Sequence, residues 1–230
     1  MYSEVNFRKE LQAAVDKRHQ VNHPIVAKWE RGEIKPETVA GSITEIWYWI
    51  SRLIPEALFS IAANGPQDVA EMEMENYGEE LDPSNPHPAL ILRFAQACGI
   101  SEAQLRAGRG LPTTEAWVTW ELRTAREQHW IASVAGLHVA SEAQEPQLFN
   151  KLLPALRTHY KFSEHDLEFW WLHADADIEH GGRAFDILAK HCTTREQQEM
   201  AIHWAGEGAR NKWMFWDGIY LHYEMGYKLQ

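Results

Sequence analysis

The sequence contains little cysteine. Only Cys98 and Cys192 occur in 230 residues. Two cysteines so far apart form neither the disulfide framework of a small secreted domain nor a cysteine-rich metal site. This composition is typical of proteins in a reducing compartment, and we expect a cytoplasmic location.

Long apolar runs are also missing. No stretch approaches the roughly 20 consecutive apolar residues that a membrane-spanning helix requires. The segment from Met1 to Arg18 is amphipathic and mixed in charge, unlike a signal peptide. Positive charge is scarce as well, with 22 Lys and Arg against 33 Asp and Glu, and a net charge of −11. Such a surface repels the phosphates of nucleic acids and of anionic membranes, so we expect neither as a partner.

Apolar and aromatic residues are plentiful. Apolar residues make up 45% of the chain and aromatic residues 11%, including 11 tryptophans. A chain of this length and composition can bury a substantial core, and we expect a single domain over residues 1–230. The tryptophans are suited either to that core or to the lining of a small-molecule pocket.

Between short breaks, the apolar residues recur with the period of a helix, and no useful stretch alternates as a strand does. The pattern predicts an all-α protein, a compact bundle of roughly seven to nine helices. The expected helices are Phe7–His19, Ile25–Arg31, a long helix from Lys35 with a kink at Pro55, Gln67–Leu81, Pro88–Cys98, Glu102–Ala107 with Ser101 as N-cap, Glu115–Gln128, Trp130–Ser141, Gln147–Tyr160, Ser163–Lys190 and Thr194–Tyr227.

One of these helices carries a possible set of metal ligands. His173, Asp177 and His180 are spaced i, i+4 and i+7. At ~100° per residue, they fall within roughly a 60° arc of one helix face. Two imidazoles and a carboxylate are suited to a redox-active or borderline divalent metal, with iron a natural candidate. The alternative is a solvated polar face, since Asp175 and Glu179 give the same helix an acidic exposed side.

Two other segments offer similar ligands. Glu80 and His87 are seven residues apart and would share one face of a continuous helix. The two prolines between them instead favour a loop or distortion that returns His87 toward the bundle, and Glu79 is the alternative to Glu80. Glu142 ends an apolar helix, where a buried acid needs a partner such as a shared cation. His138, one turn earlier, either orients Glu142 or is an ordinary core histidine. Taken singly, these acids and histidines are more often structural, but together they form a two-metal set of the kind found in helix bundles.

The order of these ligands resembles that of the haem-oxygenase-like di-iron oxidases and oxygenases. This family shares a seven-helix fold with the TenA-type thiaminases and with PqqC, the enzyme of pyrroloquinoline quinone synthesis, and includes the chlamydial-type p-aminobenzoate synthase. The resemblance covers almost the whole chain and includes the segments Ser141–Pro146, Arg109–Pro112 and Lys212–Tyr220. It implies that two irons are held by Glu80, His87, Glu142, His173, Asp177 and His180.

The resemblance also implies an activity. It suggests an oxidoreductase that uses O2 as co-substrate to oxidise a small metabolite of amino- or carboxylic-acid type, by oxidative carbon–carbon cleavage or hydroxylation. Manganese is the alternative metal, an external electron donor is a further partner that such chemistry can use, and a homodimer is expected because dimers are common among the relatives.

Some residues depart from the relatives. PqqC is metal-free, whereas this chain keeps the acids and histidines. The chlamydial-type synthase consumes one of its own tyrosines, and here Val26 takes that position, with the lysine near Lys151 shifted by one. Neither Cys98 nor Cys192 matches the thiaminase nucleophile. The alternatives to a di-iron enzyme are a metal-free PqqC-like oxidase or thiaminase-like hydrolase, and a non-catalytic metabolite-binding bundle.

Four residues are candidates for the substrate pocket. Trp47 and Trp49 are equally suited to a pocket lining and to the core. Arg52 and Lys151 can pair with a substrate carboxylate through a charge-assisted hydrogen bond. For both, a surface or structural salt bridge is the more common role.

Overall fold

The computed structural model describes residues 1–82 and 86–229, apart from the side chains of residues 175–180. Every regular element in the described residues is helical, which confirms the all-α prediction. The α-helices are α1 (Glu4–Asp16), α2 (Pro24–Glu30), α3 (Pro36–Leu53), α4 (Glu56–Asn64), α5 (Gln67–Glu80), α6 (His87–Ala97), α7 (Glu102–Ala107), α8 (Pro112–Glu127), α9 (Trp130–Val134), α10 (Glu145–Thr158), α11 (Glu168–His191) and α12 (Arg195–Ile219). No helix in the described part is both long and apolar enough to cross a membrane.

Local sequence signals explain most of the helix boundaries. The expected kink at Pro55 is a full break, with α3 ending at Leu53 and α4 beginning at Glu56, because proline disfavours helical geometry in the residue before it. Ser101 caps α7 as expected, and its side chain and that of Gln104 form a capping box. Breaks of this kind divide the described chain into more helical segments than we expected.

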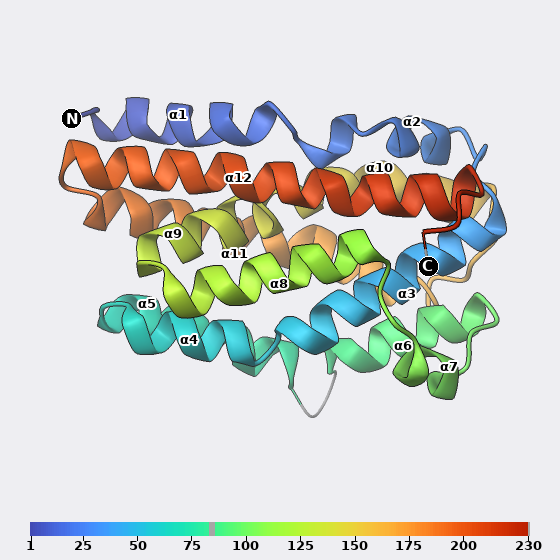
Figure 1. The fold of residues 1–230 in the computed structure, drawn as a ribbon. Helices are drawn as coiled ribbons and strands as arrows, with labels where there is room; N and C mark the ends of the chain where they lie inside the picture. Colours follow the sequence, from blue (N-terminus) through green and yellow to red (C-terminus); the bar gives the residue numbers. More distant parts are fainter. Residues whose placement is uncertain (83–85, 230) are drawn as a thin grey trace.

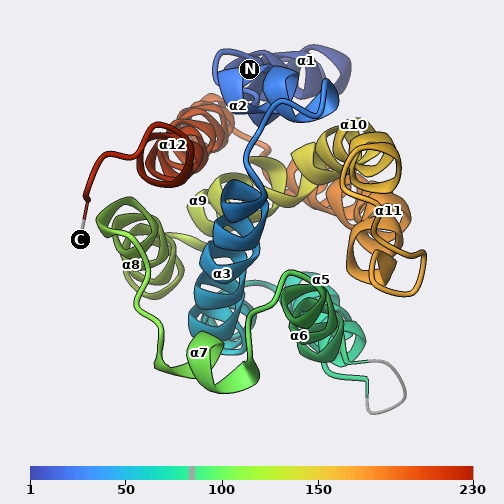
Figure 2. The same cartoon turned by 90° about the vertical axis from the view of Figure 1, so that its right-hand side faces the viewer.

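The helices pack as a bundle in which α1 lies along α12, α10 along α11, and α4 along α5 (Figure 1). Seen from the end, α3 lies in the middle of the bundle, with α8 on one side and α6 on the other (Figure 2). Residues from the N-terminal, middle and C-terminal thirds of the chain therefore meet around the same interior.

An aromatic cluster fixes α11 where the ligand motif begins. Trp170 is fully buried, and its ring centroid lies 5.3 Å from that of Phe94 and 5.2 Å from that of Phe149, both in edge-to-face geometry. These contacts join α11 to α6 and α10, and such aromatic pairs stabilise a fold beyond the area they bury. His173 is one turn after Trp170, so the cluster also fixes the position of His173.

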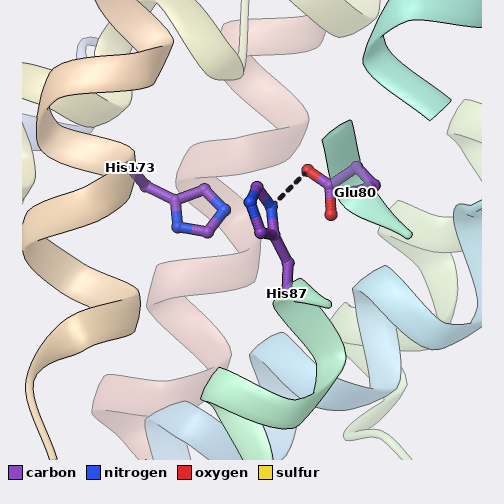
Figure 3. Close-up of side chains that lie close together, drawn as sticks. All are labelled: Glu80, His87 and His173. Carbon is purple, nitrogen blue, oxygen red and sulfur yellow. Dashed lines mark ion pairs between the residues drawn. The ribbon is translucent and has the colours of Figure 1, made fainter. Parts of the chain in front are cut away.

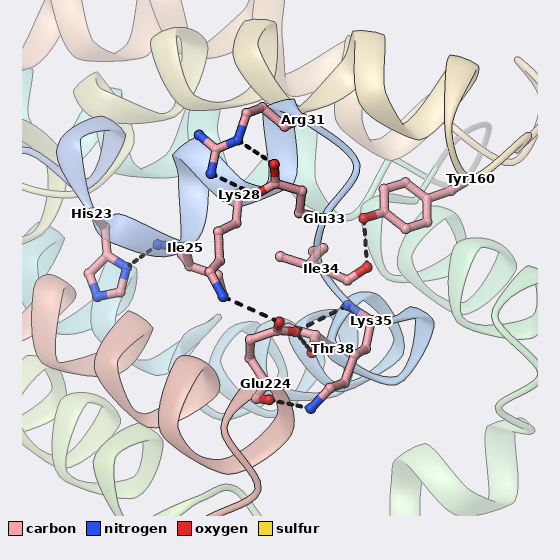
Figure 4. A network of polar contacts seen from close by, with 10 residues as sticks. All are labelled: His23, Ile25, Lys28, Arg31, Glu33, Ile34, Lys35, Thr38, Tyr160 and Glu224. Atoms are coloured by element: carbon pink, nitrogen blue, oxygen red, sulfur yellow. Dashed lines mark hydrogen bonds and ion pairs between the residues drawn. The ribbon is translucent and has the colours of Figure 1, made fainter.

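Polar contacts tie the end of the chain to the start of α3 (Figure 4). Glu224 lies in a π-helical turn, Tyr220–Glu224, that follows α12. Its carboxylate accepts hydrogen bonds from the backbone N–H of Lys35 at 3.1 Å and from the Thr38 hydroxyl at 2.8 Å, and it lies 3.7 Å from Nζ of Lys28. The contacts join α12, α2 and α3 at one end of the bundle.

A close backbone contact holds α11 against the short 3₁₀ helix Glu142–Gln144. A Cβ atom built on Gly181 would lie 2.8 Å from Cβ and 2.9 Å from Cα of Ala143. The next residue, Gly182, has no described atom within 4 Å of such a Cβ. Only glycine therefore lets the segment that contains Glu142 approach α11 so closely at position 181.

This pair of glycines gives a matched test. We expect Gly181→Ala to lower the free energy of unfolding by about 1–3 kcal/mol, because the added methyl group overpacks the contact with Ala143. Gly182→Ala should raise it by about 0.5–1 kcal/mol, because alanine favours an exposed helix interior more than glycine does. Urea unfolding of the two variants measures both values. Equal shifts in the two variants would contradict the close contact.

A buried ion pair joins α12 to α10. Lys212 is 2% exposed, and its Nζ lies 3.1 Å from Oε1 of Glu145 and 3.3 Å from the ring centroid of Trp49. A lysine buried to this degree needs both a carboxylate and an aromatic face to offset the loss of water. By contrast, Lys190 pairs with Asp68 at 2.7 Å on the surface.

The two lysines should therefore respond differently to the same substitution. We expect Lys212→Met to lower the free energy of unfolding by about 3 kcal/mol, because it leaves the Glu145 carboxylate buried without its ammonium group. Lys190→Met should cost less than about 1 kcal/mol, since water screens an exposed pair. Chemical denaturation separates the two outcomes, and a cost for Lys212→Met as small as that for Lys190→Met would argue against the buried pair.

Candidate metal centre

Three predicted ligands from three helices converge in the interior (Figure 3). Glu80 is the last residue of α5, His87 is the first residue of α6, and His173 lies in the first half of α11. One ligand atom from each side chain lies within 4.8 Å of the other two. Both histidines are buried, at 6% and 5% exposure.

Glu80 and His87 lie at the facing ends of two successive helices, since α5 ends at Glu80 and α6 begins at His87. Nδ1 of His87 lies 3.2 Å from Oε1 of Glu80. The neighbouring Glu79 has a more exposed side chain and lies 3.6 Å from the guanidinium group of Arg183. Of the two adjacent acids, Glu80 is therefore the one that the structure places beside His87.

A backbone hydrogen bond orients His173. Its Nδ1–H donates to the carbonyl oxygen of Phe169 at 2.7 Å. This bond assigns the proton to Nδ1 and leaves the lone pair on Nε2, the arrangement typical of metal-binding histidines. The ring centroid of His173 lies 4.5 Å from that of His87.

The atoms of this cluster are suited to a metal ion. Within the described part of the chain, buried Oε2 of Glu80 and Nδ1 of His87 make no hydrogen bond, and Nδ1 has only the ion-pair contact with Oε1 of Glu80. Unpartnered buried polar atoms are costly, and a bound cation removes that cost. One carboxylate and two imidazoles form a donor set that fits iron.

Glu142 lines the same cavity as Glu80 and His173, and a buried histidine holds it. Nδ1 of His138 lies 2.8 Å from Oε2 of Glu142, and Nε2 lies 2.8 Å from Oε1 of Glu73. Burial by itself would lower the pKa of His138, but the two carboxylates raise it well above its usual value. The imidazole is therefore protonated, and both of its N–H groups donate to carboxylates.

His138 lies in a π-helical segment, Ala135–Val139, where we expected an uninterrupted helix. This segment packs against α12 so tightly that a Cβ atom on Gly208 would lie 2.2 Å from the carbonyl oxygen of Gly136. π-Helical turns are frequent at functional sites. They depend on such tertiary contacts, so the sequence pattern alone does not reveal them.

Glu73 was not predicted from the sequence. It is fully buried on α5 and lies seven residues before Glu80. That spacing places both carboxylates on one helix face, which is the signal that could have identified it. The predicted ligands Asp177 and His180 belong to α11, but their side chains lie outside the described residues.

A narrow cavity of about 50 Å³ adjoins the cluster. Its apolar side is formed by residues of α3, α4 and α11, among them Trp49, Leu53, Leu58 and Phe169. A space of this size admits a few water molecules or a small ligand group.

The four predicted pocket residues lie in different surroundings. Trp49 lines the cavity, and Trp47 lines an adjoining pocket that also includes Glu80. Arg52 is exposed on α3, and Lys151 is exposed on α10, 3.8 Å from Glu30. Neither cation is among the described residues that line the cavity.

The sequence matches a family model and two relatives from bacteria. A family model for iron-containing redox enzymes matches residues 48–213, well over half of the chain. The 4-aminobenzoate synthase of Nitrosomonas europaea is 26% identical over 228 residues, which cover 94% of this chain and 92% of that protein. The 4-aminobenzoate synthase of Chlamydia muridarum is 25% identical over 178 residues, which cover 76% and 75% of the two chains.

Solved structures show the same fold. A protein of Shewanella denitrificans, a domain of unknown function with a haem-oxygenase-like fold, superimposes with a TM-score of 0.80 at 14% identity, covering 97% of this chain and 94% of that one. The likeness in fold agrees with the match to the family model, in which the ligand-bearing helices are included. The chain therefore belongs to the family of iron-containing redox enzymes, and it is an oxidoreductase with a haem-oxygenase-like fold.

Proposed function

We propose that the protein is an O2-dependent, non-haem di-iron oxidase or oxygenase that acts on a small metabolite of amino- or carboxylic-acid type. The observation that supports this most strongly is the convergence of Glu80, His87 and His173, from three helices, beside a cavity that Glu142 also lines. Buried ligand atoms on Glu80 and His87 that form no hydrogen bond with the described residues support a metal site over a purely structural cluster.

In this proposal, Glu80, Glu142 and the histidines of α6 and α11 hold the irons, and Asp177 and His180 complete the set by their position on α11. The chemistry that bound iron would supply there is the reduction of O2, which is typical of such carboxylate–histidine sites. Other groups of the protein hold these ligands in position. The Phe169 carbonyl orients His173, and His138 holds Glu142 in place.

The substrate is proposed to be a separate molecule. The relatives from Nitrosomonas and Chlamydia are named for 4-aminobenzoate synthesis, and the chlamydial-type reaction consumes a tyrosine of the enzyme itself. Here Val26 takes the position of that tyrosine, and the described residues that line the cavity include no tyrosine. An amine or carboxylic acid that enters from outside is therefore the better fit to this chain.

The hydrolase alternative has less support. Burial raises the pKa of both Cys98 and Cys192 to about 12. A thiol with so high a pKa is a weak nucleophile at neutral pH, and neither cysteine is among the described residues of the cavity.

Several expectations stay predictions from the sequence. These are the homodimer, the external electron donor, the manganese alternative, the cytoplasmic location and the single domain.

Metal analysis tests the proposal directly. Protein loaded anaerobically with Fe(II) and then desalted should contain about two irons per chain, as measured by plasma mass spectrometry. We expect His87→Ala and His173→Ala each to lower the iron content by at least half, because each removes a ligand. His203→Ala is the matched control, since this histidine is exposed on α12, and it should keep the wild-type content.

A second measurement uses the same samples. On exposure to O2, the loaded wild-type protein should consume O2 and develop a transient visible absorption, whereas the two ligand variants should show neither. If His87→Ala and His173→Ala bind as much iron as the wild type, the proposed site is wrong.

A further inference from the structure

The cavity beside the metal cluster is also lined by a second group of charged residues. Glu121 and Glu145 face it from α8 and α10, and Lys212 of α12 lies next to them. These helices differ from α5, α6 and α11, which carry Glu80, His87 and His173. The second group, which we call the acidic subsite, therefore consists of two carboxylates and one ammonium group.

The ammonium group of Lys212 is already engaged. Its Nζ lies 3.1 Å from Oε1 of Glu145 and 3.3 Å from the ring centroid of Trp49. Glu121 is fully buried and accepts a hydrogen bond from Nε1–H of Trp49 at 2.5 Å on its Oε2. Its Oε1 has no hydrogen-bond partner in the described structure. The acidic subsite is thus one positive charge short of neutrality when both carboxylates are ionised.

The raised pKa of Glu121 agrees with the lack of a second positive charge beside the two carboxylates. Burial raises the pKa of Glu121 to about 8, although the nearby Lys212 acts to lower it. A carboxyl group without a compensating charge stays neutral in such surroundings. A second cation in the cavity would allow Glu121 to ionise.

The buried polar atoms of the cavity that make no hydrogen bond indicate which groups a ligand would have to supply. Among the described residues that line it, the buried polar atoms without a partner are all oxygens: Asn76 Oδ1, Glu80 Oε2, Glu121 Oε1 and Ser141 Oγ. A metal ion accounts for Glu80. Asn76 Oδ1 accepts hydrogen bonds, Glu121 Oε1 does so when the carboxyl group is ionised, and the Ser141 hydroxyl can accept as well as donate. A primary ammonium group offers three N–H donors and a positive charge. Trp49, Leu53 and Phe169 provide apolar contacts for a hydrocarbon part.

We propose that the acidic subsite binds the primary ammonium group of the substrate, with Glu121 as the carboxylate that pairs with it. The hydrocarbon part of the molecule then lies along the apolar side of the cavity, toward Glu80 and His173. The placement of the reacting carbon rests on the proposed function, but the binding of the ammonium group does not. A carboxylate in the same position would instead require Glu121 to remain protonated and to donate a hydrogen bond.

The test is a binding titration with small probes. Iron(II)-loaded protein, kept anaerobic at pH 7, is titrated by calorimetry with n-propylammonium, n-propanol and propionate. We expect n-propylammonium to bind at least about tenfold more tightly than the other two, because it forms charge-assisted hydrogen bonds. Its binding should release about one proton as Glu121 ionises, which titrations in buffers of different ionisation enthalpy measure.

Two glutamine variants on one helix provide the comparison. Glu121→Gln keeps the size of the side chain and an acceptor for Trp49, but it removes the charge, and n-propylammonium should bind about tenfold more weakly with no proton release. Glu127→Gln is the matched control, because Glu127 is exposed on α8 and pairs with Arg123. It should bind the probe as the wild type does.

The outcomes separate the two proposals. Any of three results would overturn the acidic subsite as an ammonium site. The first is tighter binding of propionate or n-propanol than of n-propylammonium, and the second is binding of n-propylammonium without proton release. The third is equal affinity of Glu121→Gln and wild type for n-propylammonium. If Glu121→Gln does not fold, the proton release and probe preference of the wild type decide alone. Iron content, measured on the same samples, reports on the metal site, so protein without iron that still binds n-propylammonium would contradict the proposed function and support the ammonium site.

Discussion

A buried imidazole joined to two carboxylates connects the parts of the molecule that supply the candidate metal ligands. His138 contacts Glu73 on α5, the helix that ends at Glu80, and Glu142, which lines the cavity. Removing a buried charge that two partners satisfy is costly, so this arrangement fixes α5 relative to the Glu142 segment. The packing of Gly181 on Ala143 then fixes that segment relative to α11. Together, the two contacts determine how far apart the ligand-bearing elements lie.

Two chemically different groups of residues meet at the cavity. Imidazoles and carboxylates from α5, α6 and α11 form a set that fits iron. Glu121 and Glu145, with Lys212 beside Glu145, come instead from α8, α10 and α12. Because the two groups are carried by different helices, substitutions in one leave the residues of the other in place, so oxidation chemistry and recognition of a substrate can change separately. It is consistent with a family in which one fold serves different reactions.

Much of the fold could be predicted from the sequence because local rules determine it. The period of the apolar residues predicted the helices, and Ser101 predicted a cap that the structure contains. Pro55 predicted only a kink, where the structure has a full break between α3 and α4. The prolines between Glu80 and His87 predicted an interruption, and α5 does end at Glu80 while α6 begins at His87. What could not be predicted depends on contacts between distant residues. The π-helical turn at His138 requires the close approach of Gly208, and the pairing of Lys212 with Glu145 joins residues 67 positions apart. Glu121 was missed for the same reason, since its partner Trp49 lies on α3. Glu73 was missed although its spacing from Glu80 is a local signal.

The surroundings of half-buried Cys98 and buried Cys192 have a consequence for an enzyme that handles O2. Reduced iron in the presence of O2 generates hydrogen peroxide as a by-product, and peroxide oxidises cysteine through its thiolate form. Because the pKa of both thiols is raised to about 12, almost none of either is thiolate at neutral pH. The chain therefore presents no ready thiol target to the oxidant that its own proposed site would release, and self-inactivation by sulfenic acid formation should be slow.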